Sequence, residues 1–487
     1  MKGVSLLCSC VIAPALAQIF DTLQVVRDLP DAVAVNAGNY VSCANAAWPP
    51  SDVGFELIPQ APDDDLKAAL AEIDTSRIEA IISKLVSFGT RHTLSTQNST
   101  THGIGAARDW IAAEMRKYAE ASEGQMTVTV PSYIQSVANR ISFPVKISNI
   151  VATLKGSTDP DRVYIVSGHY DSRVTDIMDY TSDAPGANDD ASGVAVSLEL
   201  ARIMATRRPK ASIAFVAVAG EEQGLYGAAN LAQRYRNASV NIEGMITNDI
   251  IGSSRGEHNI SDPYTIRLFA QGPPLTESTA LAASRLSIGG ENDSPARQLA
   301  RFMAEVASNN ATGMNIAVIY RLDRFLRGGD HSAFLQQGYA GIRYSEPNEN
   351  FDHQHQDVRV ENGIQYGDLA EFVDYEYVTR VAKVNLVGLW SIANAPGKVK
   401  NLTVTTTTLG NDSELKWLAS DSEDLEGYEL VWRATTAPMW SHSVLIGNVS
   451  SVTVPLSKDN VILGIRSVGK NGYKSPAVYP GPSPFPE

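Results

Sequence analysis

The chain has 487 residues, of which 44% are hydrophobic and 19% are charged. This composition is typical of a folded globular protein and excludes a largely disordered chain, and the length predicts two or three domains. The formal net charge of −14 argues against nucleic acid or an anionic membrane surface as a partner.

The first seventeen residues, MKGVSLLCSCVIAPALA, have the form of a secretory signal peptide. They contain one lysine, an apolar run too short to span a bilayer, and Ala15-Leu16-Ala17 before Gln18. We therefore expect cleavage after Ala17 and a secreted, extracellular protein. Only Cys43 lies outside this segment, so a mature chain would form no disulfide within itself.

Eight N-x-S/T sequons support export, because their number exceeds what chance matches alone would suggest, and they predict a glycoprotein. They lie at Asn98, Asn237, Asn259, Asn292, Asn310, Asn401, Asn411 and Asn448. No later apolar stretch is long enough for a transmembrane helix, so no membrane partner is expected.

Residues 18–75 form an irregular segment with two proline-rich pieces, WPPSDVG and IPQAPDDD. Its lack of periodicity indicates either a pro-segment that is removed or an arm that packs on the main domain. The sequence leaves both open. A regular pattern begins at Ser76.

Residues 76–394 alternate between apolar strands and amphipathic helices, which is the pattern of an α/β domain. Strands are expected at MTVTV, ISNIVATL, VYIVSG, SIAFVAVAG, MITNDI, NIAVIY and GIRYSE. Helices are expected at IEAIISKLVSFG, IGAARDWIAAEMRKYA, SGVAVSLELARIMATRR, GLYGAANLAQRYR, PARQLARFMAEVA and HSAFLQQG, with a long helix through the region 363–394. The sequence thus predicts a mostly parallel central sheet flanked by helices.

The pattern changes at Ala395-Pro396-Gly397, after which short strands are separated by Gly, Asn, Asp and Ser. Residues 396–487 therefore predict a C-terminal β-sandwich. The aromatic positions and the GYKSP ending resemble a fibronectin type III domain. The junction suggests that this domain is a separate unit, so a chain ending near Ala395 is expected to stay active.

Acidic and histidine side chains follow the predicted buried strands. They are His169, Asp171, Asp189, Asp190, Glu221, Glu222, Asp249 and His353. Because ligands in open parallel α/β sheets bind at the carboxyl ends of the strands, we expect these side chains to converge.

Several carboxylates in one cleft repel one another, so a cation is expected among them. Histidine and carboxylate ligands without a thiolate match a catalytic zinc site, and the number of carboxylates suggests two ions with a shared ligand. Each segment alone has a simpler interpretation, since an acid before a helix is usually an N-cap and paired glutamates usually face solvent. Their joint occurrence at successive strand ends favours the metal site.

The ordered motifs GHYDS, GANDDASG, GEEQGLYGA, ND and a late histidine with Asp four residues on resemble the co-catalytic di-zinc aminopeptidase family. The resemblance covers roughly residues 80–394 and implies a zinc-exopeptidase fold with two zinc ions. Carried over by motif, the metal ligands would be His169, Asp189, Glu222, Asp249 and His353, with Asp189 bridging both ions. Glu221 would be the general base, and Asp171 would orient His169.

The last ligand is the point at which the sequence departs from the family pattern. Asp352 precedes His353 where many secreted members have Tyr, and this makes His355 a rival ligand. The spacing to Asp357 favours His353. Asp330-His331 matches an element near the site and is given only a supporting role.

The resemblance implies a zinc aminopeptidase that removes the N-terminal residue of peptides with a free N-terminus, and we expect a monomer. Two zinc ions would activate a shared water molecule, and Glu221 would take its proton. Three alternatives stay open: a carboxypeptidase or dipeptidase, a glutaminyl cyclase of the same superfamily, or a non-catalytic secreted binding protein.

Overall fold

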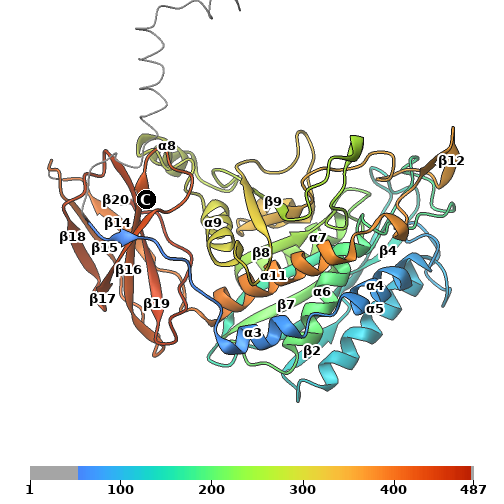
Figure 1. Cartoon of the computed structure of the whole chain (residues 1–487), viewed down its shortest axis with the longest axis horizontal. Coiled ribbons are helices and arrows are strands. Elements are labelled where there is room, and N and C mark those ends of the chain that lie inside the picture. The colour runs from blue at the N-terminus through green and yellow to red at the C-terminus, as the bar shows by residue number, and fades with distance from the viewer. Residues whose placement is uncertain (1–52, 408, 484–487) are drawn as a thin grey trace, which may run out of the picture.

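The structure, a computed structural model, describes residues 53–407 and 409–483 (Figure 1). It contains a mixed α/β domain and a β-rich C-terminal region, as the sequence predicts. The expected signal peptide, most of the segment 18–75 and all three cysteines lie outside the described residues. Among the described residues, none of the helices combines the length and apolar character needed to cross a membrane.

An eight-stranded sheet forms the centre of the α/β domain, with strand order β10-β9-β11-β8-β6-β7-β5-β2. The strands are β2 (Met126–Thr129), β5 (Ile150–Leu154), β6 (Asp159–His169), β7 (Ala211–Val218), β8 (Asn241–Asn248), β9 (Thr265–Ala270), β10 (Asn315–Ile319) and β11 (Gly341–Ser345). The four central strands β11, β8, β6 and β7 are mutually parallel. Their carboxyl ends therefore share one edge of the sheet, and antiparallel pairs occur only outside them.

Helices cover both faces of this sheet, because its central strands are apolar on both sides. The helices are α3 (Asp64–Ala71), α4 (Thr75–Val86), α5 (Gly103–Glu120), α6 (Ala191–Met204), α7 (Tyr226–Asn237), α8 (Thr279–Ser287), α9 (Pro295–Ala307), α10 (Asp330–Gln336) and α11 (Tyr375–Asn394). The larger core packs α4, α5, α6, α9 and α11 on one face, and a smaller core packs α7 and α10 on the other.

The helix predicted through 363–394 starts later than expected. Residues 364–366 form strand β13 (Ile364–Tyr366), which pairs with β12 (Arg359–Glu361), and α11 begins only at Tyr375. Asp374 ends the irregular stretch because its carboxylate caps the backbone N–H of Tyr377 at 2.9 Å. The hairpin of β3 (Ser132–Gln135) and β4 (Val145–Ser148), strand β9 and helix α8 are further elements that the sequence did not predict.

Two four-stranded sheets enclose the core of the C-terminal region. One contains β1 (Phe55–Glu56), β17 (His442–Gly447), β16 (Leu425–Ala434) and β19 (Val461–Gly469). The other contains β18 (Ser451–Val454), β15 (Ser413–Leu418), β14 (Lys400–Thr405) and β20 (Gly481–Ser483). Strand β1 comes from the predicted N-terminal arm and pairs with this region, whereas α3 of the same arm packs in the larger core of the α/β domain.

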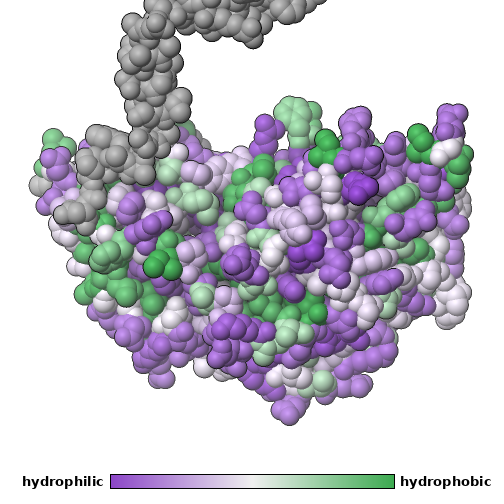
Figure 2. Space-filling model, viewed as in Figure 1, coloured by the Kyte–Doolittle hydropathy of each residue, from purple (hydrophilic) through white to green (hydrophobic). Residues whose placement is uncertain are grey.

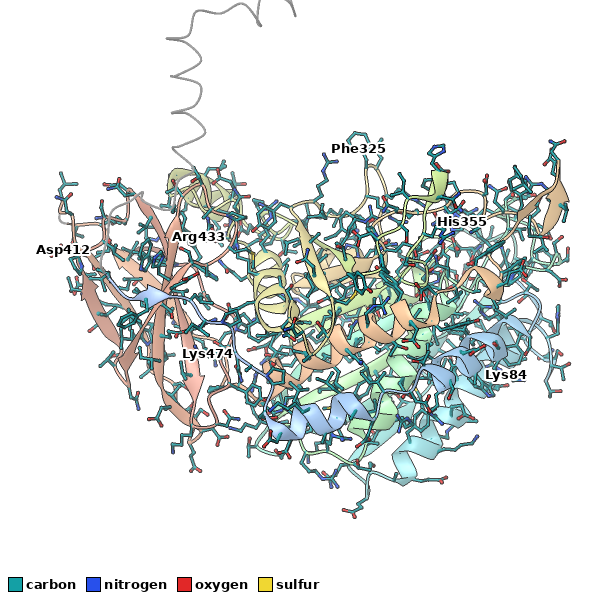
Figure 3. The ribbon with its side chains drawn as sticks, in the orientation of Figure 1. Lys84, Phe325, His355, Asp412, Arg433 and Lys474 are labelled. Carbon is teal, nitrogen blue, oxygen red and sulfur yellow. The ribbon has the colours of Figure 1, made fainter. Side chains whose placement is uncertain are left out.

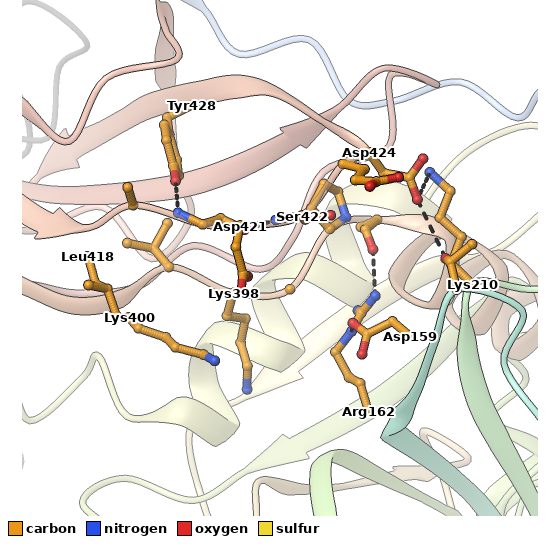
Figure 4. A pocket seen from close by; sticks show the side chains of 18 residues that line it. Asp159, Arg162, Lys210, Lys398, Lys400, Leu418, Asp421, Ser422, Asp424 and Tyr428 are labelled. Carbon is orange, nitrogen blue, oxygen red and sulfur yellow. Dashed lines mark hydrogen bonds and ion pairs between the residues drawn. The ribbon is translucent and has the colours of Figure 1, made fainter.

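The C-terminal region contacts the α/β domain through buried polar groups. Tyr473 accepts a hydrogen bond from Trp390 Nε1 of α11 at 2.8 Å and donates to Asp63 Oδ2 at 2.6 Å. Figure 4 shows where the two parts separate, at a polar cavity of about 740 Å³ that contains the ion pair of Lys210 with Asp424. The interface between the two parts thus contains buried hydrogen bonds at Tyr473 and a cavity at Lys210 and Asp424.

Candidate metal centre

Close packing of β6 against α6 places the first histidine. A Cβ on Gly168 would lie 2.3 Å from the backbone carbon of Gly193, so glycine is required where the strand meets the helix. His169 follows as the last residue of β6, and its backbone N–H donates to Asp190 Oδ2 at 2.9 Å. Asp190 also caps α6 through the N–H of Gly193, so this acid positions the backbone.

Two groups of side chains meet at the shared sheet edge. His169, Asp189 and Asp249 form one group, and Asp189, Glu222 and His355 form the other, with the potential ligand atoms of each group within 4.8 Å of one another. His169 Nε2 lies 3.0 Å from Asp189 Oδ1 and 3.8 Å from Asp249 Oδ1. His355 Nε2 lies 2.8 Å from Asp189 Oδ2 and 3.1 Å from Glu222 Oε1. Asp189 therefore faces both groups, one oxygen to each.

The structure corrects the choice of His353. Its ring stacks on Phe372, with centroids 3.7 Å apart, and it belongs to neither group. The rival residue, His355, occupies the expected place, with φ of 57° at the turn that points it inward. The spacing to Asp357 was misleading, because that carboxylate accepts the backbone N–H of Thr175 at 3.2 Å.

Asp171 acts mainly on the two glutamates and less directly on His169 than predicted. Its Oδ1 accepts the backbone N–H of Glu221 at 3.2 Å, and its Oδ2 accepts that of Glu222 at 3.1 Å and the hydroxyl of Thr93 at 3.0 Å. The closer oxygen to His169 Nδ1 is the Asp171 backbone carbonyl at 3.1 Å, while Oδ1 lies 3.7 Å away. The buried carboxylate thus fixes the backbone that carries Glu221 and Glu222.

The sequence did not predict the roles of three supporting residues, because each lies far along the chain from the residue that it contacts. Arg343 of β11 pairs with Asp249 Oδ1 at 2.8 Å. Asp368 Oδ2 accepts the backbone N–H of Asp189 at 2.7 Å, and Arg173 Nε donates to Glu222 Oε2 at 2.8 Å. No local motif marks Arg343 or Asp368, although Arg173 follows closely on GHYDS.

Sequence comparison identifies the family. The model for Peptidase family M28 matches residues 149–375, which include every residue of both groups. A "Probable zinc metalloprotease" from Pyrenophora tritici-repentis is 63% identical over 480 residues, covering 98% of this chain and 99% of the relative. The chain belongs to Peptidase family M28. A protein of the same description from Pyricularia oryzae is 61% identical over 484 residues, covering 98% and 96% of the two chains. This M28 protein is therefore a zinc metallopeptidase.

Solved structures show more distant similarity to this M28 peptidase. The crystal structure of the Legionella pneumophila LapA aminopeptidase matches 69% of this chain and 76% of its own, with 16% identity and a TM-score of 0.48. A Porphyromonas gingivalis glutaminyl cyclase matches 65% and 98%, with 17% identity and a TM-score of 0.41. Likeness at this level does not distinguish the two reactions.

The donor set of the M28 peptidase fits zinc. Two imidazoles and three carboxylates are ligands that zinc takes, and Glu222 Oε1 is buried without a hydrogen bond. Burial lowers the pKa of His355, but Glu222 and Asp189 outweigh this effect and raise it to about 9. The carboxylates of Glu222 and Asp189 therefore stabilise a positive charge beside them, and a bound metal cation would supply that charge.

Glu221 lies beside these groups without belonging to either of them. Burial raises its pKa well above the usual value; His169 opposes this, while Asp249 and Glu222 add to it. A carboxylate whose proton affinity is raised in this way is suited to accept a proton from water.

Asp330 and His331 belong to neither ligand group and instead stabilise the segment beside the site. Burial raises the pKa of Asp330 to about 7, and His331 Nε2 lies 2.8 Å from the carbonyl oxygen of Leu322. This bond ties α10 to the loop before it, which agrees with a supporting role.

A cavity of about 310 Å³ opens over the two groups. Its wall contains the acids Asp189, Glu221, Glu222 and Asp249, the arginines Arg140, Arg173, Arg324 and Arg327, and Gly224, Leu225, Leu326, Gly328, Gln354 and His355. Figure 3 shows His355 and Phe325 on the same side of the molecule, with Phe325 at the tip of a projecting loop. The same projection is apolar in the surface view of Figure 2, and Phe325 is 76% exposed.

Proposed function

We propose that this M28 peptidase is an aminopeptidase that holds two zinc ions. The observation that carries the proposal is Asp189, whose two carboxylate oxygens face different ligand groups. His169 and Asp249 would complete one site, and Glu222 and His355 the other. A one-zinc cyclase would leave one of these complete donor groups without a use.

Zinc would supply a Lewis acid and lower the pKa of bound water toward 7. Glu221 accepts the proton of the attacking water and donates it to the leaving amine. Asp171 holds the backbone of Glu221, so the carboxylate keeps its direction during both transfers. Leu225 and Leu326 offer apolar surface in the cavity wall for a substrate side chain.

The free N-terminus is selected by the carboxylates at the base of the cavity. Asp189, Glu222 and Asp249 would share their charge with the zinc ions, so Glu221 is the carboxylate that attracts an α-ammonium group, whereas an acetylated terminus has no charge to offer it. A carboxypeptidase would need to place the substrate α-carboxylate there instead.

A panel of leucine and lysine anilides tests this function. Free-amine anilides should be cleaved and their N-acetyl forms should be inert; a chelator should abolish cleavage and zinc should restore it. Release of the C-terminal residue from an N-blocked dipeptide, with no action on free-amine anilides, would indicate a carboxypeptidase. Cyclisation of an N-terminal glutamine without hydrolysis would indicate a cyclase.

We also propose that the protein is secreted as a glycosylated monomer. The signal-like sequence 1–17 supports export, and all eight sequon asparagines are exposed. Expression in a eukaryotic secretion host should release the protein into the medium without residues 1–17 and with a mass that falls on treatment with a glycosidase. Retention in the cell with Met1 present would contradict export.

A further inference from the structure

We infer that the mouth of the cavity recognises a carboxylate on the substrate, beyond the residue that is removed. This inference rests on the proposed function, because it concerns the same cavity. Four arginines contribute to the wall, which is a large share of cationic groups for one small cavity. Two of them, Arg140 and Arg327, have guanidinium groups with donors to spare.

Arg140 comes from the loop between β3 and β4. It is exposed, and only its Nη1 has a described partner, the backbone carbonyl of Glu222 at 3.1 Å. Its φ of 58° lies in the left-handed region, which is uncommon for a residue with a side chain. The backbone therefore takes an unfavourable conformation where it brings a cation to the second ligand group.

Arg327 comes from a different segment of the wall, the loop before α10. Among the described residues its guanidinium has one partner, Glu349 Oε2, 3.2 Å from Nη1. Glu349 is also bound by Arg324 and Arg267, so three guanidinium groups share this carboxylate. A second carboxylate, from a ligand, would be accommodated without displacing an existing pair.

The other two arginines are already engaged. Arg173 bonds Glu222, His355 and the carbonyl of Val174, and Arg324 pairs with Asp323 and Glu349. Arg173 and Arg324 therefore stabilise the wall, and the remaining hydrogen-bond donors belong to the exposed Arg140 and the partly exposed Arg327.

Charge in the cavity supports the same conclusion. Four carboxylates and four guanidinium groups balance in the wall, and two divalent ions would leave the cavity positive. Since the amine end of the substrate is directed to the carboxylates at the base, the downstream part of the peptide extends towards Arg140 and Arg327. A carboxylate there gains charge-assisted hydrogen bonds that a neutral group does not.

Two sources offer this chemistry: an acidic side chain at the second position, or the free α-carboxylate of a dipeptide. Leucine release should be measured for two matched pairs, Leu-Asp-amide against Leu-Asn-amide, and Leu-Ala against Leu-Ala-amide. We expect the charged member of at least one pair to have the higher kcat/KM, by about tenfold. The pair that shows the preference identifies the source.

Variants then locate the preference. Arg140→Ala and Arg327→Ala should each lower the charged-to-neutral ratio severalfold, whereas Arg321→Ala should keep the wild-type ratio. Arg321 is an exposed arginine of the same loop that does not belong to the cavity wall. High salt should reduce the wild-type ratio, because it screens the attraction.

Binding to the Glu221→Gln protein, measured by calorimetry, gives a readout without turnover. Leu-Asp-amide or Leu-Ala should bind more tightly than its neutral partner, and Arg327→Ala should remove the difference. Normal cleavage of the neutral amides with ratios of one or less in both pairs would overturn the carboxylate site alone. Carboxylate-selective binding without any zinc-dependent hydrolysis would overturn the proposed function and leave the binding site standing.

Discussion

Glu221 and Glu222 are neighbours in sequence but have different surroundings. Glu222 Oε1 lies 3.1 Å from His355 Nε2 and Oε2 lies 2.8 Å from Arg173 Nε, whereas Glu221 belongs to neither ligand group. Glu221→Gln should keep its zinc and lose kcat by about a hundredfold or more, the scale of general acid–base catalysis. Glu222→Gln should lose zinc instead. Metal analysis beside steady-state kinetics separates the two, and equal metal loss in both would refute the division.

Asp171 is predicted to affect the reaction rate by fixing the backbone of Glu221 and Glu222. In Asp171→Asn the amide group would face one of the N–H or hydroxyl donors that the carboxylate now accepts, from Glu221, Glu222 and Thr93. We expect kcat/KM to fall by about 10–100-fold, as for outer partners of metal ligands. Thr93→Val removes only one of these bonds and should cost less. A wild-type rate for Asp171→Asn would show that the backbone of the glutamates needs no such anchor.

Of the five residues that form the two metal-ligand groups, the sequence predicted four. His169, Asp189, Glu222 and Asp249 each follow a buried strand or precede a buried helix, so local pattern is enough to place them. His355 lies in a loop without periodicity, and its direction depends on a left-handed turn that the sequence does not mark. Asp368 and Arg343 depend on tertiary contacts that no spacing rule describes.

Among the elements, the contact between β6 and α6 decides whether the site forms. In Gly168→Ala the new Cβ would meet the backbone of Gly193 at 2.3 Å and of Val194 at 2.4 Å, so strand and helix must separate. His169 and Asp189 are carried by these two segments, so we expect both the melting temperature and the zinc content to fall. Gly397→Ala is the matched control, since its Cβ would have nothing within 4 Å. An unchanged Gly168→Ala protein would show that the contact tolerates a methyl group.

Regular elements with a strong apolar pattern were predictable, and those governed by capping or edge pairing were not. The central strands and α6 are nearly continuous apolar runs. By contrast, α11 begins only at Tyr375, where Asp374 caps it, and this is twelve residues after the start of the predicted region 363–394. Strand β1 has only two residues and exists because it pairs with β17, a partner almost 400 residues away in the chain.

For the whole molecule, buried ion pairs join the C-terminal region to the α/β domain. Arg433 of β16 pairs with Asp293 at 2.8 Å, and Arg466 of β19 pairs with Glu305 of α9 at 2.8 Å. Removing Arg466 leaves the buried charge of Glu305 without its described partner, which costs about 3–5 kcal/mol. Asp293, in contrast, keeps a second partner in Arg301 at 3.0 Å. The sequence-based expectation that a chain ending near Ala395 stays active therefore needs revision.

We now expect the truncated chain to be insoluble or much less stable than the full chain. The single change Arg466→Ala, which removes the described partner of Glu305, should lower the free energy of unfolding by about 3–5 kcal/mol, as measured by denaturant titration. Lys416→Ala, which breaks an exposed pair with Glu414 within β15, should cost about 1 kcal/mol or less. A soluble, fully active truncation would restore the view of an independent domain.

The most direct measurement of the central claim is zinc content per chain, by elemental analysis, for the wild-type protein and for His355→Ala and His353→Ala. The two groups around Asp189 predict about two zinc ions for the wild type, about one for His355→Ala and about two for His353→Ala. One zinc ion in the fully active wild type, or loss of zinc from His353→Ala with none lost from His355→Ala, would contradict the shared-carboxylate site.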